Sequence, residues 1–535
     1  MESMRGFFIL GFAVCSFLIY QAWQKDYGPQ PEVIKTSQSE VVSVANNSII
    51  SDNLIEVNTD LLKVKINPIG GDLVYAELAN YNVELDNLDN KVVLFDYRDR
   101  VYQAKSALLG EGAPDNQLPR AHYHSEQKSF QLAQDQKELL VPLVWKNDKG
   151  VVFEKLFTFK RGEYLINVDY KVNNQSQNDR TYNFVAEIVR DQKATGLEEK
   201  SSFGMSPFLG AAFSPEEQKY EKRSFEDLTE EPVKLSRQGG WIAFLQHYFI
   251  SAWIPQQDEF VNITTTIKQN NELVIRFVQP AISVPSHSEK SISAQLYVGP
   301  KILEQMETAA PGLEKTMDLS WVWWIGLPLY KLMKFFFSFV GNWGLAIILI
   351  TIVVKAVLYP ISAAQYRSMA NMRKLQPKMQ MLKERYGEDK ARMQQEMMKM
   401  YKEEGANPFG GCLPMLLQFP IFIALYYVLF EAIELRHAPF FGWIQDLSVM
   451  DPYFVLPLLM GGSMWLMQKL QPVSPTMDPM QQKMMQYLPV FFTVFMLWFP
   501  AGLVLYWLCN NLLSVAQQQY ITKKIENQPE KGKTK

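Results

Sequence analysis

The sequence predicts a polytopic α-helical membrane protein with a large extracytoplasmic β-sandwich domain and a cytoplasmic helical hairpin. Three observations indicate this fold class. An apolar stretch stands near the N-terminus, a long polar segment with alternating apolar residues follows it, and apolar runs crowd the chain from Trp321 onward. Whole-chain averages, with 20% charged residues and a net charge of −3, conceal this division. A negative net charge also disfavours a nucleic-acid-binding protein, which normally carries a basic surplus.

The N-terminal apolar stretch covers residues 6–23 and has Arg5 in front of it. A cleaved signal peptide would end in a small-x-small site, whereas Trp23 and polar residues follow this apolar core. We therefore expect a retained signal-anchor helix over residues 1–26. Because positive flanks stay in the cytoplasm, this helix places the N-terminus inside and exports the chain that follows.

A polar linker over residues 27–55 precedes a β domain that we assign to residues 56–317. The clearest strands flank the Arg161-Gly162 turn, where phenylalanines share one face before the turn and apolar residues alternate with polar ones after it. Further strands are predicted near residues 181–190, 260–268, 272–279 and 291–298. Many short alternating strands separated by turns indicate a β-sandwich.

The segment 318–340 is rich in tryptophan and phenylalanine and carries Lys331 and Lys334. Aromatic residues favour the boundary between membrane and water, so we expect an interfacial amphipathic helix that lies along the bilayer. Pro328 is expected to interrupt a full membrane crossing.

The remaining chain predicts the transmembrane helices of the core. Apolar runs cover residues 342–359, 412–430, 453–468 and 487–513. We assign transmembrane helix 2 to residues 341–360, helices 3–6 to residues 412–522, and a basic cytoplasmic tail to residues 523–535.

The charge distribution decides how the last apolar run is divided. The segment 361–411 is strongly basic, and basic loops remain in the cytoplasm. If residues 487–513 formed a single span, the basic tail would be exported, whereas a hairpin broken at Pro500 keeps it inside. We therefore predict six transmembrane helices, with both chain termini in the cytoplasm.

The cytoplasmic segment 361–411 is expected to form a helical hairpin with its turn at Gly387-Glu388-Asp389 and a kink at Pro377. The segment is also rich in methionine. Methionines at helical spacing fill a core in many proteins, but they also suit adaptable binding surfaces. The sequence leaves both interpretations open.

Lys355 is the candidate functional residue of the first core span, because no carboxylate in that span neutralises it. A charge near the centre of a bilayer costs about 3 kcal/mol or more and marks a functional site by default. Thr351 lies one turn earlier on the same face. The alternative is that Lys355, close to the cytoplasmic end, extends its ammonium to water.

Other polar residues interrupt the apolar spans. Gln418 lies in the second apolar run, and Asn510 and Asn511 follow Tyr506 in the last. Each residue alone suits a hydrogen bond between helices. Together with Lys355 they indicate a water-containing cavity in the cytoplasmic half of the membrane.

Enzymatic motifs are absent from the sequence. The chain contains no GxGxxG, HExxH or GxSxG motif, and its five histidines are dispersed. The three cysteines, Cys15, Cys412 and Cys509, lie in apolar segments without metal-ligand or disulfide spacing. We therefore expect no enzymatic activity, no cofactor and no metal.

The run NPFGGCLPMLLQFPIFIALYYVL (407–429) resembles the corresponding region of the YidC/Oxa/Alb membrane-protein insertases. Three further motifs are similar to that family, namely VKAVLYPISAAQYRSMANM (354–372), DPMQQKMM (478–485) and FPAGLVLYW (499–507). The N-terminal anchor and the β domain are similar to the Gram-negative bacterial branch, so the resemblance covers nearly the whole chain.

The resemblance implies a membrane protein insertase and chaperone of the bacterial inner membrane, in which five helices form the core around a hydrophilic groove. Lys355 takes the position where the family usually has Arg, so the charge is kept but the bidentate guanidinium is lost. The resemblance also places Thr351, Gln418 and Tyr506 in the groove and Phe422 on the surface along which a client helix slides.

The same resemblance implies the partners. These are nascent membrane proteins, the Sec translocon (SecYEG and SecDF), the ribosome through the hairpin and tail, and membrane lipid. An alternative function, a small-solute transporter or channel that uses Lys355, is disfavoured because the sequence contains no detectable inverted repeat.

Overall fold

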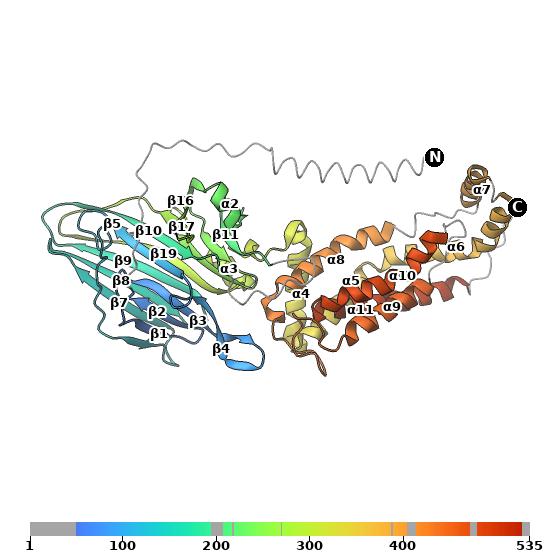
Figure 1. Ribbon diagram of the computed structural model, residues 1–535, viewed down its shortest axis with the longest axis horizontal. Helices are drawn as coiled ribbons and strands as arrows, with labels where there is room; N and C mark the ends of the chain where they lie inside the picture. Colours follow the sequence, from blue (N-terminus) through green and yellow to red (C-terminus); the bar gives the residue numbers. More distant parts are fainter. Residues whose placement is uncertain are drawn as a thin grey trace.

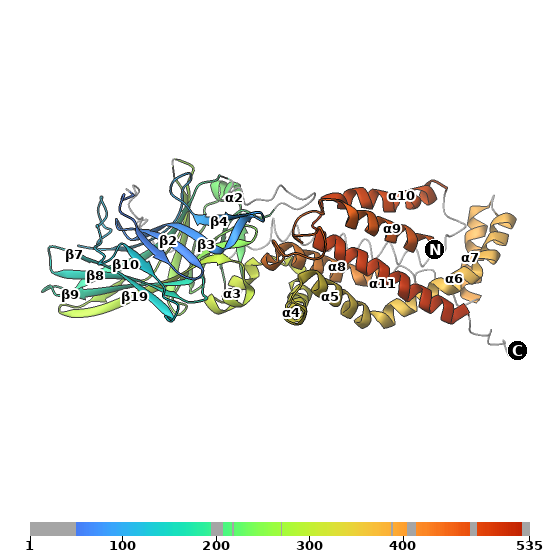
Figure 2. The ribbon, with the colours of Figure 1, turned by 90° about the horizontal axis from the view of Figure 1, so that it is seen from below.

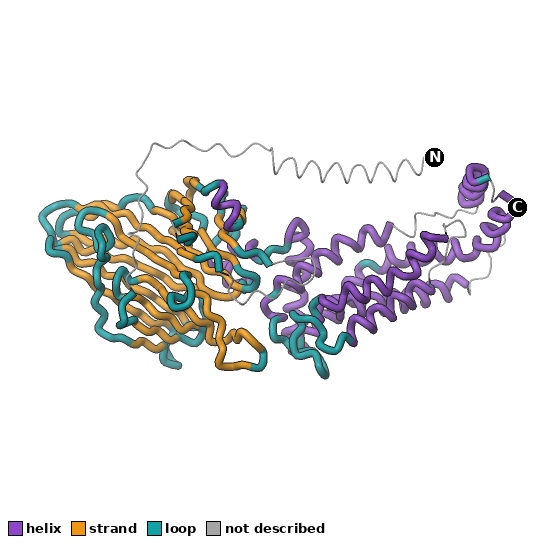
Figure 3. The backbone as a smooth tube through the Cα atoms, viewed as in Figure 1, coloured by secondary structure: helices purple, strands orange, loops and turns teal. Residues whose placement is uncertain are grey.

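The computed structural model describes residues 50–193, 207–216, 219–268, 270–386, 389–403, 413–470 and 479–526. These residues form an elongated molecule with strands at one end and helices at the other (Figures 1 and 3). The predicted signal anchor, most of the linker, the turn residues Gly387 and Glu388, and the tail beyond residue 526 lie outside the described residues. Cys15 and Cys412 lie outside them too.

The larger sheet of the β domain has eleven strands within the described residues. They are β1 (Ile55–Asn58), β2 (Leu62–Asn67), β3 (Asp72–Glu84), β4 (Asn87–Phe95), β5 (Tyr102–Leu109), β6 (Ser129–Gln131), β10 (Arg180–Arg190), β13 (Lys234–Gln238), β16 (Phe260–Ile267), β17 (Leu273–Val278) and β18 (Ile282–Val284). Their order is β13-β16-β17-β10-β5-β3-β2-β1-β6, with β18 beside β10 and β4 beside β3.

The smaller sheet has eight described strands in the order β12-β11-β14-β15-β19-β9-β8-β7. They are β7 (Glu138–Lys146), β8 (Val151–Lys160), β9 (Leu165–Asn174), β11 (Gly210–Phe213), β12 (Glu221–Arg223), β14 (Ile242–Leu245), β15 (Phe249–Pro255) and β19 (Ser288–Pro300). Two short helices, α2 (Phe225–Glu230) and α3 (Leu303–Ala309), complete the domain.

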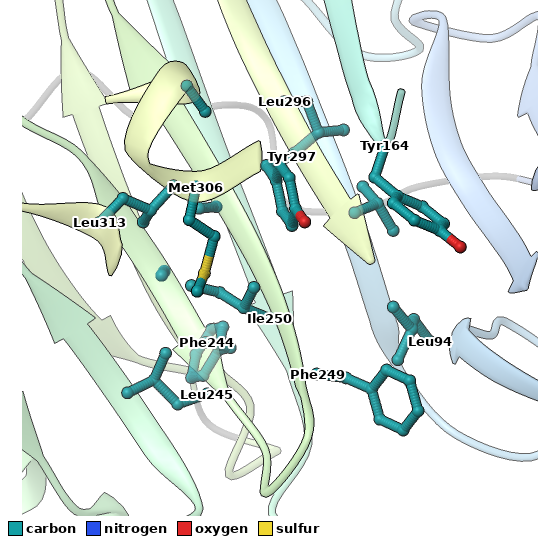
Figure 4. Close-up of a cluster of buried hydrophobic side chains, with 14 of the residues drawn as sticks. Leu94, Tyr164, Phe244, Leu245, Phe249, Ile250, Leu296, Tyr297, Met306 and Leu313 are labelled. Atoms are coloured by element: carbon teal, nitrogen blue, oxygen red, sulfur yellow. The ribbon is translucent and has the colours of Figure 1, made fainter. Parts of the chain in front are cut away.

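The two sheets face each other across one apolar core, which confirms the predicted β-sandwich. Alternation along β8 and β9 buries every apolar residue that the sequence assigned to the inner face, and Phe157 pairs with Val168 across the two strands. Rings from opposite sheets meet edge to face, as Phe153 and Tyr182 do at 5.3 Å between ring centroids. Figure 4 shows the Met306 side chain of α3 extending toward Ile250 of β15 within this core.

A buried charge network lies between the sheets, and nothing in the alternating pattern predicted it. Arg120 donates to Asp72 Oδ2 at 2.6 Å and to Asp115 Oδ1 at 2.7 Å. Lys155 donates to the Gly70 carbonyl at 3.1 Å. Burial lowers the pKa of Lys155 to about 7 and raises the pKa of the Asp115 carboxyl.

The helical part begins with α4 (Trp323–Val340), α5 (Trp343–Val357) and the pair α6 (Tyr359–Tyr386) and α7 (Lys390–Glu403), which lies in the segment where the sequence predicted a helical hairpin. It continues with α8 (Leu413–Glu431), α9 (Val455–Lys469), α10 (Pro479–Phe495) and α11 (Ala501–Glu526). The break at Pro500 separates α10 from α11, as the sequence predicted. Helix α4 continues through Pro328, and α6 continues through Pro377.

Helix α11 is the centre of the helical part and contacts α5, α6, α8 and α9, while α10 packs on the other side of α9 (Figure 2). Within the described residues, no single helix is long and apolar enough to cross a bilayer by length and composition. The pair α5 and α6, bent by 67° where they meet, passes that criterion together.

The α6–α7 hairpin lies at the end of the molecule opposite the β domain (Figure 1). Its own small core contains Leu375, Met379, Met397, Met400 and Tyr401. The structure therefore answers part of the question that the methionines raised. Met379, Met397 and Met400 fill the space between the helices. In contrast, Met381 and Met398 are 60% and 42% exposed.

Candidate functional site

The site is built on one face of α11, where Tyr506, Asn510 and Ser514 follow each other at intervals of four residues. Helix α8 runs in the opposite direction beside it, so its residues meet this face in reverse order. Gln418 Nε2 donates to Asn510 Oδ1 at 2.9 Å. One turn further along α8, the Phe422 ring stacks on Tyr506 with 6.2 Å between ring centroids.

Lys355 reaches the same face of α11 from α5. Its ammonium donates to Ser514 Oγ at 2.7 Å, and Ser514 donates to the Asn510 carbonyl at 2.7 Å. The side chain is only 4% exposed. Among the residues that the structure describes, no carboxylate forms an ion pair with Lys355, so its charge is balanced only by hydrogen-bond dipoles.

A cavity of about 360 Å³ adjoins the Lys355 side chain. Its lining consists of Ile352, Lys355, Ala356, Tyr359, Leu513 and Gln517. Gln517 Oε1 is buried without a hydrogen-bond partner in the described part of the chain. A cation and an open acceptor at one apolar cavity can attract an acidic or polar group that enters from the side.

The structure brings most of the predicted site residues together. Lys355, Gln418, Phe422 and Tyr506 all contact the same face of α11 or belong to it. Thr351 is different, because its hydroxyl donates to the Ile347 carbonyl of its own helix at 2.6 Å.

Sequence reasoning missed Ser514 and Gln517. The signal that could have found Ser514 is its spacing, since it lies four residues after Asn510 on a stripe that begins at Tyr506. Asn511 lies off this stripe. Its amide donates to Ser463 Oγ of α9 at 3.1 Å, so it serves as a contact between helices.

The ends of α5 and α11 nearest the β domain are covered by the loop between α8 and α9. The backbone amides of Ala501 and Gly502 donate to the carbonyls of Val449 and Leu447 at 2.7 and 2.9 Å. At α5, a Cβ on Gly344 would lie 2.0 Å from the Phe440 ring, so the loop packs directly on this helix. The loop closes the helical part at this end, opposite the end where Lys355 lies.

Comparisons with known proteins agree with this architecture. A family model described as "YidC periplasmic domain" matches residues 54–332, and one described as "60Kd inner membrane protein" matches residues 335–528. The membrane protein insertase YidC of Shewanella pealeana is 46% identical over 98% of this chain and 99% of its own length. The membrane protein insertase YidC of Haemophilus influenzae strain PittEE is 46% identical over 98% of each chain.

Among solved structures, an active YidC insertase with its first transmembrane domain resolved covers 88% of this chain and 92% of its own. Its sequence identity is 20% and the TM-score is 0.37. The two family models together cover the β domain and the helical part, and the relatives align over nearly their full lengths. The chain therefore belongs to the YidC family of inner-membrane protein insertases.

Proposed function

We propose that this chain is a membrane protein insertase and chaperone of the bacterial inner membrane. It inserts and helps to fold integral membrane proteins, alone or together with the Sec translocon. Full-length similarity to curated insertases supports this function. The single structural observation that carries it is the buried Lys355 ammonium beside a cavity whose other lining residues are mostly apolar.

In the proposed topology, six helices cross the membrane, five of them form the core, and both termini lie in the cytoplasm. The β domain and the α6–α7 hairpin occupy opposite ends of the molecule (Figure 1), which suits a periplasmic domain and a cytoplasmic hairpin. The basic residues of α6 and α7 support this orientation. Helix α4 would lie along the periplasmic surface with Trp323 and Trp324 in the lipid headgroups.

The mechanism follows from the cost of moving polar chain through hydrocarbon. A polar groove beside α11 shortens the dry distance, and Lys355 attracts acidic residues of the translocated segment while Gln418 lines the route. The half-buried Phe422, stacked on the buried Tyr506, offers an aromatic surface to the apolar client helix. That helix then enters lipid with a gain of roughly 25 cal/mol per Å² of apolar surface.

The partners follow from this role. Nascent membrane proteins are the clients, and lipid receives them. The exposed methionines and basic residues of the hairpin, with the basic tail, suit contact with emerging clients or with the ribosome. The Sec translocon, SecYEG with SecDF, is the further partner that we propose for this role.

Substitution of Lys355 tests the proposal in proteoliposomes, with one acidic-tailed and one neutral-tailed client. We expect Lys355→Arg to insert both clients, because the charge is retained. Lys355→Ala should slow the acidic-tailed client about tenfold, and Lys355→Glu should slow it further through repulsion. The neutral-tailed client is the internal control.

Equal rates for the wild type and Lys355→Ala with both clients would remove Lys355 from the mechanism. The transporter alternative predicts a different result, namely steady solute flux through proteoliposomes that contain no client. The insertase names of the relatives do not favour this alternative.

A further inference from the structure

The end of α8 and the turn after it, residues 430–436, are held by the β domain. We call this segment the α8 turn. The imidazole of His247, between β14 and β15, donates from Nε2 to the Phe430 carbonyl at 3.0 Å. Its ring also lies 4.4 Å from the Phe430 ring. Burial lowers the pKa of His247 to about 3, so the imidazole is neutral and Nε2 carries the donated proton.

A second contact joins the α8 turn to the end of β19. Lys301 Nζ lies 3.4 Å from Glu431 Oε2, and both side chains are buried. The Lys301 backbone amide donates to the Tyr248 carbonyl at 2.8 Å. Because Tyr248 follows His247 in the chain, this backbone hydrogen bond fixes the positions of Lys301 and His247 relative to each other within the β domain.

Two more contacts hold the α8 turn, and we call the four contacts together the grip. Arg436 Nη2 donates to the Val83 carbonyl of β3 at 2.8 Å, and Tyr330 of α4 donates to Glu434 Oε1. Four residues within the seven-residue α8 turn thus contact three separate parts of the β domain and helix α4. A buried ion pair costs desolvation energy that an apolar contact would avoid, and its best-attested use is to specify one geometry.

Helix α8 connects this grip to the candidate site. Phe422, Tyr426 and Phe430 lie four residues apart on one face, and the Tyr426 and Phe430 rings stack at 6.2 Å. Phe422 lies nine residues before Glu431, about 14 Å along the helix at 1.5 Å per residue. A shift of the α8 turn is therefore transmitted to the Phe422–Tyr506 pair.

We propose that His247 and Lys301 are positioning residues of the insertase. They hold the β-domain end of α8 so that Phe422 stays against Tyr506 when a client helix passes. Neither residue touches the client. The inference rests on the proposed function, but it makes a structural claim that can be measured without any client.

The first experiment measures geometry in the full chain reconstituted in lipid nanodiscs. Cys15, Cys412 and Cys509 are replaced by serine, and spin labels are attached at Leu88 of β4 and Phe419 of α8, which are 69% and 57% exposed. We expect Lys301→Met to broaden the distance distribution between the labels. A matched control is Lys331→Met, because the Lys331–Glu307 pair at 3.1 Å also joins the β domain to α4 but does not touch α8.

The second experiment measures insertion in proteoliposomes. We expect Lys301→Met to slow insertion about fivefold, since small misplacements of a guiding surface reduce rates strongly. Lys331→Met should be close to the wild type. The exchange of both charges, Lys301→Glu with Glu431→Lys, should restore the rate to within about twofold. His247→Phe keeps the ring contact and loses the hydrogen bond, so it should slow insertion by a smaller factor. This second variant also tests the inference if Lys301→Met fails to fold.

The two experiments separate the inference from the proposed function. If Lys301→Met broadens the distance distribution but the wild type inserts no client, the insertase function is contradicted and the structural role of the grip is supported. An unchanged distribution, together with equal insertion rates for Lys301→Met, Lys331→Met and the wild type, would overturn the inference and reduce the contact to a tether.

Discussion

Gly70 and Arg120 occupy the same small space between the sheets of the β domain. Gly70 has a φ of +80°, and a Cβ at this position would lie 2.3 Å from Arg120 Cζ. Gly70→Ala must therefore strain the backbone and displace a guanidinium whose carboxylate partners are buried. We expect it to lower the free energy of unfolding by about 3 kcal/mol or more, measured by urea unfolding of the full chain in detergent.

Gly162 supplies the control for this substitution. Its φ of +76° is nearly the same, but a Cβ there would have nothing within 4 Å. Gly162→Ala should therefore cost only the backbone strain, about 1 kcal/mol. Equal losses at the two glycines would show that the contact with Arg120 is unimportant.

Lys155 should give the β domain a stability that depends on pH. Its pKa is lowered from 10.5 to about 7, mainly by burial, and the groups that face it are Asp72, Asp115, Arg120 and Tyr170. Between pH 7 and 10.5 the unfolded chain binds more protons at this residue, so stability should rise with pH across this window. Below pH 7 the lysine is charged in both states and the penalty is constant.

Comparison with Lys155→Met isolates this effect. We expect the difference in unfolding free energy between the wild type and the variant to change in favour of the wild type from pH 7.5 to 9.5. The slope should be at most about 1.4 kcal/mol per pH unit, as for one proton. Parallel pH profiles for the two proteins would contradict a lowered pKa.

At the scale of single elements, the methionines of the α6–α7 hairpin divide between a core and an exposed surface. Met379, Met397 and Met400 hold the two helices together, and Met381 and Met398 remain on the surface. We expect deletion of residues 383–395 to slow client insertion in proteoliposomes several-fold, because it removes the tip of the hairpin with its basic residues Lys383, Arg385 and Arg392. Insertion at the wild-type rate would make the segment a spacer.

A milder change tests the surface methionines alone. Met381→Gln with Met398→Gln should slow insertion without loosening the hairpin. Met379→Gln is the matched control, because this side chain is 1% exposed and its change should destabilise the helix pair. Hydrogen exchange of α6 and α7 distinguishes the two effects.

The elements that sequence patterns predict well are those whose partners are local. Alternation predicted β8 and β9, because each strand buries one face against the same core. Pro500 predicted the break between α10 and α11 for the same reason, since proline acts on its own helix turn. Proline alone does not end a helix, since α4 continues through Pro328 and α6 continues through Pro377.

Features that depend on distant partners were not predictable. The charges of Asp72, Asp115 and Arg120 suggest exposed residues until the fold brings them together between the sheets. In the candidate site, Lys355 was conspicuous because a charge in an apolar run is costly. Ser514, its hydrogen-bond partner, lies 159 positions away, and a serine in an apolar helix carries no comparable cost that would draw attention to it.

At the scale of the whole molecule, the proposed topology predicts the side on which each end of the molecule lies. Reporter fusions at Glu404 and Lys533 should give cytoplasmic signals, and a fusion in the β domain at Lys149 should give a periplasmic one. A periplasmic signal at Lys533 would contradict the division of residues 487–513 into two spans. A cytoplasmic signal at Lys149 would contradict the signal anchor.

The grip on the α8 turn also has a temporal consequence. Val83 and Arg436 are 353 residues apart, so the ribosome needs roughly 20 to 70 s to supply the second after the first, at 5–20 residues per second. In the proposed topology, the β domain is by then outside the membrane, and its contact site for α8 is vacant. The Val83 carbonyl, the Lys301 ammonium and the His247 imidazole stay hydrated during this delay, whereas an exposed apolar patch in their place would promote aggregation. The polar chemistry of this contact therefore suits a protein whose two halves are made at different times and meet only when synthesis is nearly complete.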